Sequence, residues 1–114
     1  MKLKFLEKLD GLVIERPVDF SYHGVRVQFT ALIDLVPTDK IAEITSGQGS
    51  SDAGTVRKLL TGWKHMKDPT AENDKATDIE FSPDTLDELL RYGGIAARLA
   101  IECVNAQYEV REKN

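Results

Sequence analysis

The chain has 114 residues, of which 41% are hydrophobic and 30% charged, a balance that excludes a wholly disordered protein. Its 15 Lys and Arg residues and 19 Asp and Glu residues give a formal net charge of -4. A net negative charge gives no general attraction to a polyanion, so nucleic acid is not expected as a partner.

Cys103 is the single cysteine and cannot form an internal disulfide, which indicates a reducing compartment. The two isolated histidines, His23 and His65, lack the spaced partners of a metal site. Apolar residues near the start alternate with charged ones too often for a signal peptide, and no run approaches the ~18 apolar residues of a membrane span. We therefore expect a single domain over residues 1–114, with no cofactor, no metal and no membrane association.

Residues 12–36 alternate between apolar and polar side chains on either side of His23 and Gly24, as two strands joined by a two-residue turn would. Pro17 cannot donate to a strand ladder and suits an edge strand. The sequence leaves open whether this hairpin packs on the rest of the chain or projects to pair with another copy. Such a turn places three apolar pairs on one face, namely Tyr22 with Val25, Phe20 with Val27, and Val18 with Phe29.

Residues 38–112 have helical patterns. A short helix is predicted to start within residues 37–39 and to be stopped by residues 47–50, and a second helix follows a cap at Ser51 or Asp52. The second helix carries an apolar stripe with the spacing i, i+3, i+4 and i+7, formed by Val56, Leu59, Leu60 and Trp63. Residues 64–80 are polar and predict an exposed, mobile loop.

Ser82 and Pro83 then mark the start of a third helix, with Ser as its cap and Pro at its first position. Gly93 and Gly94 are predicted to end it, and a last helix is expected over residues 95–111. The sequence thus predicts an α+β fold, in which an N-terminal antiparallel β-hairpin precedes about four α-helices in a small bundle.

No catalytic constellation is apparent, and we expect no enzymatic activity. Cys103 lacks a partner base and is best explained as a buried apolar residue of the last helix. Gly47 and Gly49 superficially suggest a phosphate loop, but no Lys-Ser/Thr pair follows them and Asp52 would repel a phosphate. Function is therefore sought in a surface.

The candidate partner-binding residues are Trp63, Leu59, Leu60, Phe81 and Leu86. All five can be explained as core residues, and for Leu59 and Leu60 this is the simpler interpretation. Trp63 stands beside Gly62 just before the polar loop, where a large aromatic side chain could also anchor a partner's apolar helix.

Three motifs in order along the chain resemble the small tail assembly chaperones of long-tailed bacteriophages and prophages. They are an early strand at residues 29–35 (FTALIDL), a Leu-x-Gly-Trp signature at residues 60–63 (LTGW), and the helix entry at residues 81–90 (FSPDTLDELL). A short helix follows the first motif and a variable polar loop the second. The chain departs from the family's pattern in the lysines of its loop and in Gly93-Gly94-Ile95, where a bulkier apolar junction is usual.

The resemblance implies a non-catalytic protein of the bacterial host's cytoplasm that is absent from the mature virion. It would coat the tape measure protein, keep it soluble and help to recruit tail-tube subunits, and it could self-associate. Trp63, Phe81 and the neighbouring leucines would form or support the contact. A competing hypothesis is a small acidic adaptor or inhibitor that masks a basic surface of a host protein.

Overall fold

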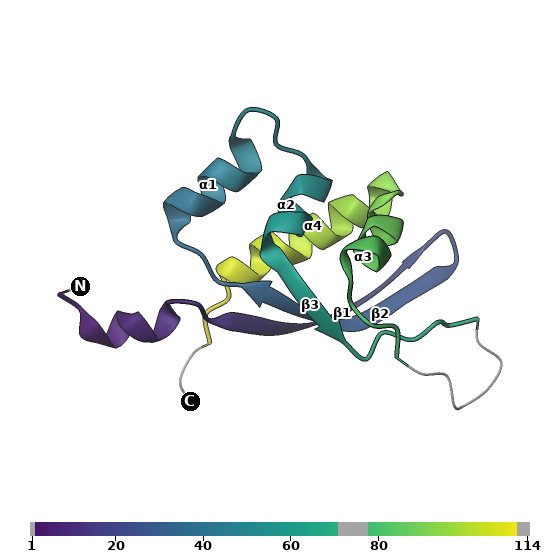
Figure 1. Ribbon diagram of the computed structural model, residues 1–114, viewed down its shortest axis with the longest axis horizontal. Helices are drawn as coiled ribbons and strands as arrows, with labels where there is room; N and C mark the ends of the chain where they lie inside the picture. Colours follow the sequence, from purple (N-terminus) through teal and green to yellow (C-terminus); the bar gives the residue numbers. More distant parts are fainter. Residues whose placement is uncertain (1, 71–77, 112–114) are drawn as a thin grey trace.

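The computed structural model describes residues 2–70 and 78–111, which form a three-stranded sheet with helices on one of its faces (Figure 1). The predicted α+β class, with an N-terminal hairpin followed by helices, is confirmed. In chain order the elements are the 3-10 helix η1 (Lys4–Leu9), β1 (Val13–Tyr22), β2 (Val25–Asp34), α1 (Thr38–Ser46), α2 (Asp52–Leu59), β3 (Leu60–Lys64), α3 (Pro83–Leu90) and α4 (Gly93–Gln107).

The hairpin of β1 and β2 has the predicted register. The turn residues His23 and Gly24 have φ angles of 50° and 83°, the left-handed conformation that a tight two-residue turn between twisted strands requires. The predicted pairs follow from it, namely Tyr22 with Val25, Phe20 with Val27, and Val18 with Phe29. On the opposite face, Arg26 binds Asp19 through a pair of hydrogen bonds of 3.0 and 2.8 Å.

The second predicted helix is too long, because α2 ends at Leu59 and the chain continues as the strand β3. β3 runs antiparallel to β2, with Ala31 opposite Trp63. Thr61, Gly62 and Trp63 all have lower helix propensity than Leu or Lys, and strand pairing satisfies the backbone of the second edge of β2. Trp63 therefore sits on a strand and not at a helix end.

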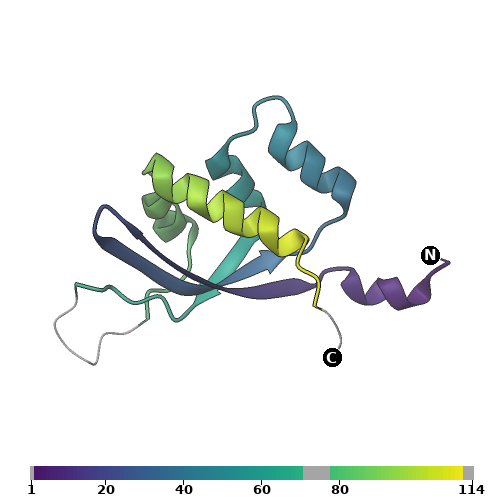
Figure 2. The ribbon, with the colours of Figure 1, turned by 180° about the vertical axis from the view of Figure 1, so that it is seen from behind.

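The helices cover one face of the sheet, with α4 lying across it (Figures 1 and 2). Alternate residues of β2 point into the layer between sheet and helices, which is why its buried and exposed positions alternate. α2 and α4 pack against each other above this layer. The core contains, among others, Val18, Phe29, Ile33, Ile41, Ile44, Val56, Leu59, Leu90, Leu99 and Cys103.

α3 begins as predicted, with Ser82 as cap. Its hydroxyl accepts a hydrogen bond from the Thr85 backbone N–H at 3.1 Å, while the Thr85 hydroxyl accepts one from the Ser82 N–H at 2.9 Å. The predicted role of Gly93 and Gly94 is corrected, because α3 already ends at Leu90 and the two glycines form the first turn of α4. Gly94 is needed there because the Tyr22 ring of β1 lies directly against it.

The predicted mobile loop over residues 64–80 is only partly visible, since residues 71–77 lie outside the described chain. Its two described ends are joined, because the Ile79 N–H donates to the Met66 carbonyl at 2.6 Å. Met66 is buried against the core. The mobility of this loop stays a prediction.

Candidate interaction surface

The five residues predicted to bind a partner come together in the structure, but in the core. Leu59, Leu60 and Leu86 are at most 5% exposed, Trp63 is 7% exposed, and Phe81 is partly buried against the same cluster. Their apolar surface is already covered by the chain itself. The structure thus agrees with the interpretation of these residues as core residues, and their contribution to a partner contact stays a prediction.

Trp63 joins the sheet to the segment before α3. Its ring contacts Phe29 of β2 and Phe81, with centroids 5.6 and 4.8 Å away, the latter edge-on. The indole Nε1 donates a hydrogen bond of 2.7 Å to the Ile79 carbonyl, so its polar atom is satisfied although the ring is buried. This geometry gives Trp63 a structural role.

Large apolar side chains do reach the surface elsewhere. The most exposed are Val110 at 82% and Phe5 at 68%. An unbroken group of such side chains on a small protein commonly marks a contact with another molecule. The full set among the described residues is Leu3, Phe5, Leu9, Leu12, Val13, Val25, Tyr92, Ile101, Tyr108 and Val110.

Half of this set belongs to one end of the molecule, where η1 leads into β1 and the chain leaves α4. Both ribbon views place the segment after α4 beside the start of β1 (Figures 1 and 2). The 3.5 Å contact between Arg16 Nη1 of β1 and Glu109 Oε2 agrees with this placement. We call this region the end surface; it comprises Leu9, Leu12, Val13, Tyr108 and Val110.

The free edge of β1 is a poor site for adding another strand. β1 lies at the edge of the sheet, as Pro17 indicated. In an antiparallel ladder every second residue pair exchanges hydrogen bonds, and counting from the turn places Pro17 and Thr30 in a pair that does not. The nitrogen of Pro17 therefore faces the free edge of β1, where it has no hydrogen to donate to an added strand. The hairpin itself packs on α4. Pairing of two copies through β1 is therefore disfavoured.

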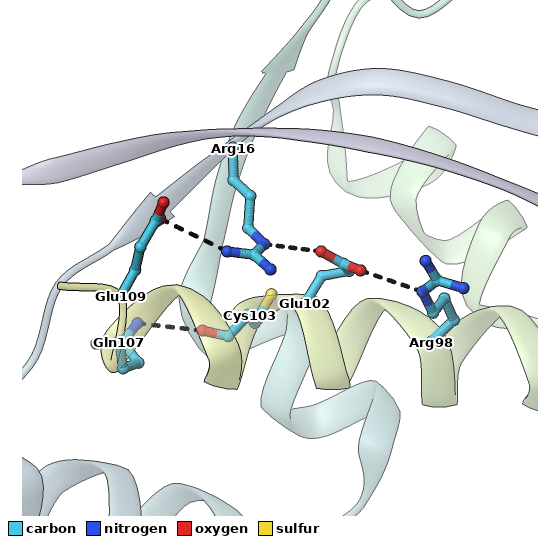
Figure 3. Close-up of polar contacts among 6 residues, drawn as sticks. All are labelled: Arg16, Arg98, Glu102, Cys103, Gln107 and Glu109. Atoms are coloured by element: carbon cyan, nitrogen blue, oxygen red, sulfur yellow. Dashed lines mark hydrogen bonds and ion pairs between the residues drawn. The ribbon is translucent and has the colours of Figure 1, made fainter. Parts of the chain in front are cut away.

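An ion-pair network connects α4 to β1 (Figure 3). Arg16 Nε donates to Glu102 Oε2 at 2.7 Å, and Arg98 Nε donates to Glu102 Oε1 at 3.1 Å. The Arg98 guanidinium also lies 5.2 Å from the centre of the Phe20 ring. Nearby, Gln107 bonds to the Asp34 carbonyl and the Val36 N–H, at 2.8 and 3.1 Å. These contacts fix the orientation of α4 on the sheet.

Glu102 is the central group of this network, and its side chain is 12% exposed. Burial alone would raise its pKa, but the hydrogen bonds and charges of Arg16 and Arg98 outweigh burial and hold the pKa below its ordinary value. The charged form therefore stabilises the fold. This contribution is present above the ordinary pKa of a Glu and is lost as the pH falls through the lowered value.

We expect Glu102→Gln to lower the free energy of unfolding by about 1–2 kcal/mol at pH 7, because two charge-assisted hydrogen bonds are weakened. The difference from wild type should shrink as the pH falls below about 4. Urea unfolding of wild type and of Glu102→Gln, at pH 7 and in the acid range, measures this difference in the free energy of unfolding. The matched control is Glu15→Gln, which weakens the exposed 2.6 Å pair with Lys64 and should cost less. Equal losses in the two variants would contradict a special role for Glu102.

Cys103 lies in the core, as predicted, at 2% exposed. Burial, with a smaller contribution from the Glu102 carboxylate, raises the pKa of its thiol to about 12. We expect no measurable alkylation by iodoacetamide at pH 8 in the native protein and ordinary reactivity in denaturant. Rapid alkylation of the folded chain would contradict this assignment.

His23 and His65 are both exposed and both have left-handed backbone conformations. Within residues 2–70 and 78–111, no group of three His, Cys, Asp or Glu side chains is arranged to hold a metal ion. Over the same ranges, no helix combines the length and apolar character that crossing a bilayer demands.

Comparison with known proteins adds no assignment, since no protein-family model, no curated protein and no solved structure matches this chain. The exposed apolar residues of η1 were missed by sequence reasoning. Leu3, Leu6 and Leu9 recur at intervals of three, which is the period of a 3-10 helix, so this spacing could have indicated η1, although it does not single out the exposed Phe5.

Proposed function

We propose that this chain is a tail assembly chaperone that binds the tape measure protein through the end surface. The observation that carries the proposal is the group of exposed apolar side chains at one end of a molecule whose net charge is negative. The motif order described above supplies the choice of partner. The proposed contact is thus formed by the exposed residues of the end surface and not by the buried Trp63 cluster.

The chemistry of such a partner suits this surface. A long helical chain with apolar stripes aggregates unless the stripes are covered. A small apolar patch gives weak, reversible binding, and many copies along one chain add avidity. The acidic remainder of each copy keeps the loaded complex dissolved through charge repulsion. Tail-tube subunits could then displace the copies one at a time.

Co-expression with the tape measure protein tests the proposal. Wild type should move most of the tape measure protein into the soluble fraction, and Val110→Asp should reduce that yield at least about tenfold, because it places a carboxylate in the apolar contact. Tyr92→Asp is the control, since Tyr92 is also exposed, at 56%, but lies near the hairpin turn, where its ring centroid is 6.4 Å from that of Tyr22. Asp is also favourable at this helix cap.

Three results would overturn the proposal. Wild type could fail to solubilise the tape measure protein, or Val110→Asp could act as well as wild type. A complex that dissociates as ionic strength rises from 0.1 to 1 M would instead support the acidic adaptor, because salt screens charge pairs and leaves apolar contacts intact.

A further inference from the structure

Residues 2–10 form an arm that the rest of the chain hardly covers. η1 contributes no buried residue, and Leu3 and Phe5 are 53% and 68% exposed. Both views show η1 extending past the start of β1, away from the helices on the sheet (Figures 1 and 2). Gly11, with a φ of 70°, joins the arm to β1 in a conformation that other residues rarely adopt. The arm thus presents Leu3 and Phe5 to solvent, whereas Leu6 is half-buried.

An open groove of about 660 Å³ lies between α4 and the connection from α1 to α2. Its α4 wall offers the apolar side chains of Ala100, Ile101 and Val104, of which Ile101 is 54% exposed, and the facing wall is polar. Among residues 2–70 and 78–111, Asp52 is the one charged residue of its lining. The polar lining residues are Thr45, Ser50, Ser51, Asp52, Thr55 and Asn105.

The arm carries a net positive charge and the rest of the chain a net negative one. The first ten residues hold three lysines and two acids, whereas the remaining 104 hold twelve basic and seventeen acidic residues. Ile101 and Val104 offer apolar contacts for a side chain such as Phe5, and Asp52 offers a negative charge for a lysine of the arm. Contact between two arms would instead bring lysines together, and β1 pairing is disfavoured at Pro17.

We propose that the arm of one copy docks in this groove of a second copy, and that a reciprocal exchange of two arms forms a symmetric dimer. Each dimer then contains the same contact twice, as a two-fold axis requires. This inference concerns the purified chain alone and does not depend on the tape measure assignment.

Sedimentation velocity of the full chain over a wide concentration range tests the inference. Wild type should form dimers that weaken as salt is added, because the arm and the body carry opposite net charges. Phe5→Asp in the arm and Ile101→Asp in the groove should each weaken dimerisation at least about tenfold, while Tyr92→Asp should not. Thermal unfolding of each variant verifies the fold, and Phe5 lies outside the core.

Mixing the two variants is the decisive step. The Ile101→Asp chain keeps an intact arm, and the Phe5→Asp chain keeps an intact groove, so the mixture should form heterodimers held by one arm where neither variant associates alone. A monomer at all concentrations would overturn the inference. So would dimers that survive Phe5→Asp, or a mixture that associates no better than its components.

Discussion

Trp63→Ala should lower the free energy of unfolding by about 3–5 kcal/mol, a large part of the stability of a domain of this size. The substitution removes the ring that fills the space between Phe29 and Phe81. It also leaves the Ile79 carbonyl without the 2.7 Å hydrogen bond from the indole. Urea unfolding followed by circular dichroism measures the change.

Trp63→Phe separates the two causes. It keeps an aromatic ring in the cluster and removes the indole N–H, so we expect a loss of about 1–3 kcal/mol, smaller than that of Trp63→Ala. A loss in unfolding free energy below about 1 kcal/mol for Trp63→Ala would contradict the burial of Trp63 and would make a direct contact with a partner plausible again.

This expectation changes how binding experiments on Trp63 should be interpreted. A variant that unfolds loses every interaction, whether or not the substituted residue touches the partner. Val110 and Phe5 avoid the difficulty, since both are largely exposed and neither belongs to the core. Substitutions at these two positions report on surface contacts.

The hairpin could be predicted residue by residue because its determinants are local. A two-residue turn at His23 and Gly24 fixes the register, and a shift by one residue would turn Val18 and Phe29 to solvent. The start of α3 was equally local, since the Ser82 cap acts within one turn. Neither feature depends on contacts with distant parts of the chain.

β3 could not be predicted in the same way. Val56, Leu59, Leu60 and Trp63 have helical spacing, yet the last two also suit a short strand, and local pattern alone does not distinguish them. The choice is made by β2, about 30 residues earlier, whose open edge pairs with Trp63 and its neighbours. Gly93 and Gly94 were misassigned for a related reason, because the Tyr22 contact that requires Gly94 is long-range.

The candidate surface was harder to predict than the fold. Hydrophobicity identifies Trp63 and Phe5 alike as residues that avoid water, but tertiary packing covers the first and leaves the second exposed. The network of Arg16, Glu102 and Arg98 was also missed, since it places a charged residue on the inner face of β1. Arg16 and Glu102 lie 86 residues apart in sequence.

Gly94→Ala should destabilise the fold by about 1–3 kcal/mol, although alanine is the better helix former. A Cβ on Gly94 would lie about 3.0 Å from Tyr22 Cδ1 and 3.1 Å from Cζ, and closer still to Cε1. The ring cannot move away freely, because it is partly buried and packs edge-on against His23 with centroids 4.5 Å apart. The added methyl must therefore displace either the hairpin end or the first turn of α4.

A double-mutant cycle tests whether the effect of Gly94→Ala on stability changes sign when the Tyr22 ring is removed. In a Tyr22→Ala background the obstructing ring is gone, and Gly94→Ala should then be neutral or stabilising by up to about 1 kcal/mol, through helix propensity alone. Urea unfolding of the four proteins gives the coupling between the two positions. If Gly94→Ala has the same effect in both backgrounds, the close approach of β1 to α4 does not explain the glycine. If the sign reverses, that contact accounts for a glycine at a position where helix propensity favours alanine.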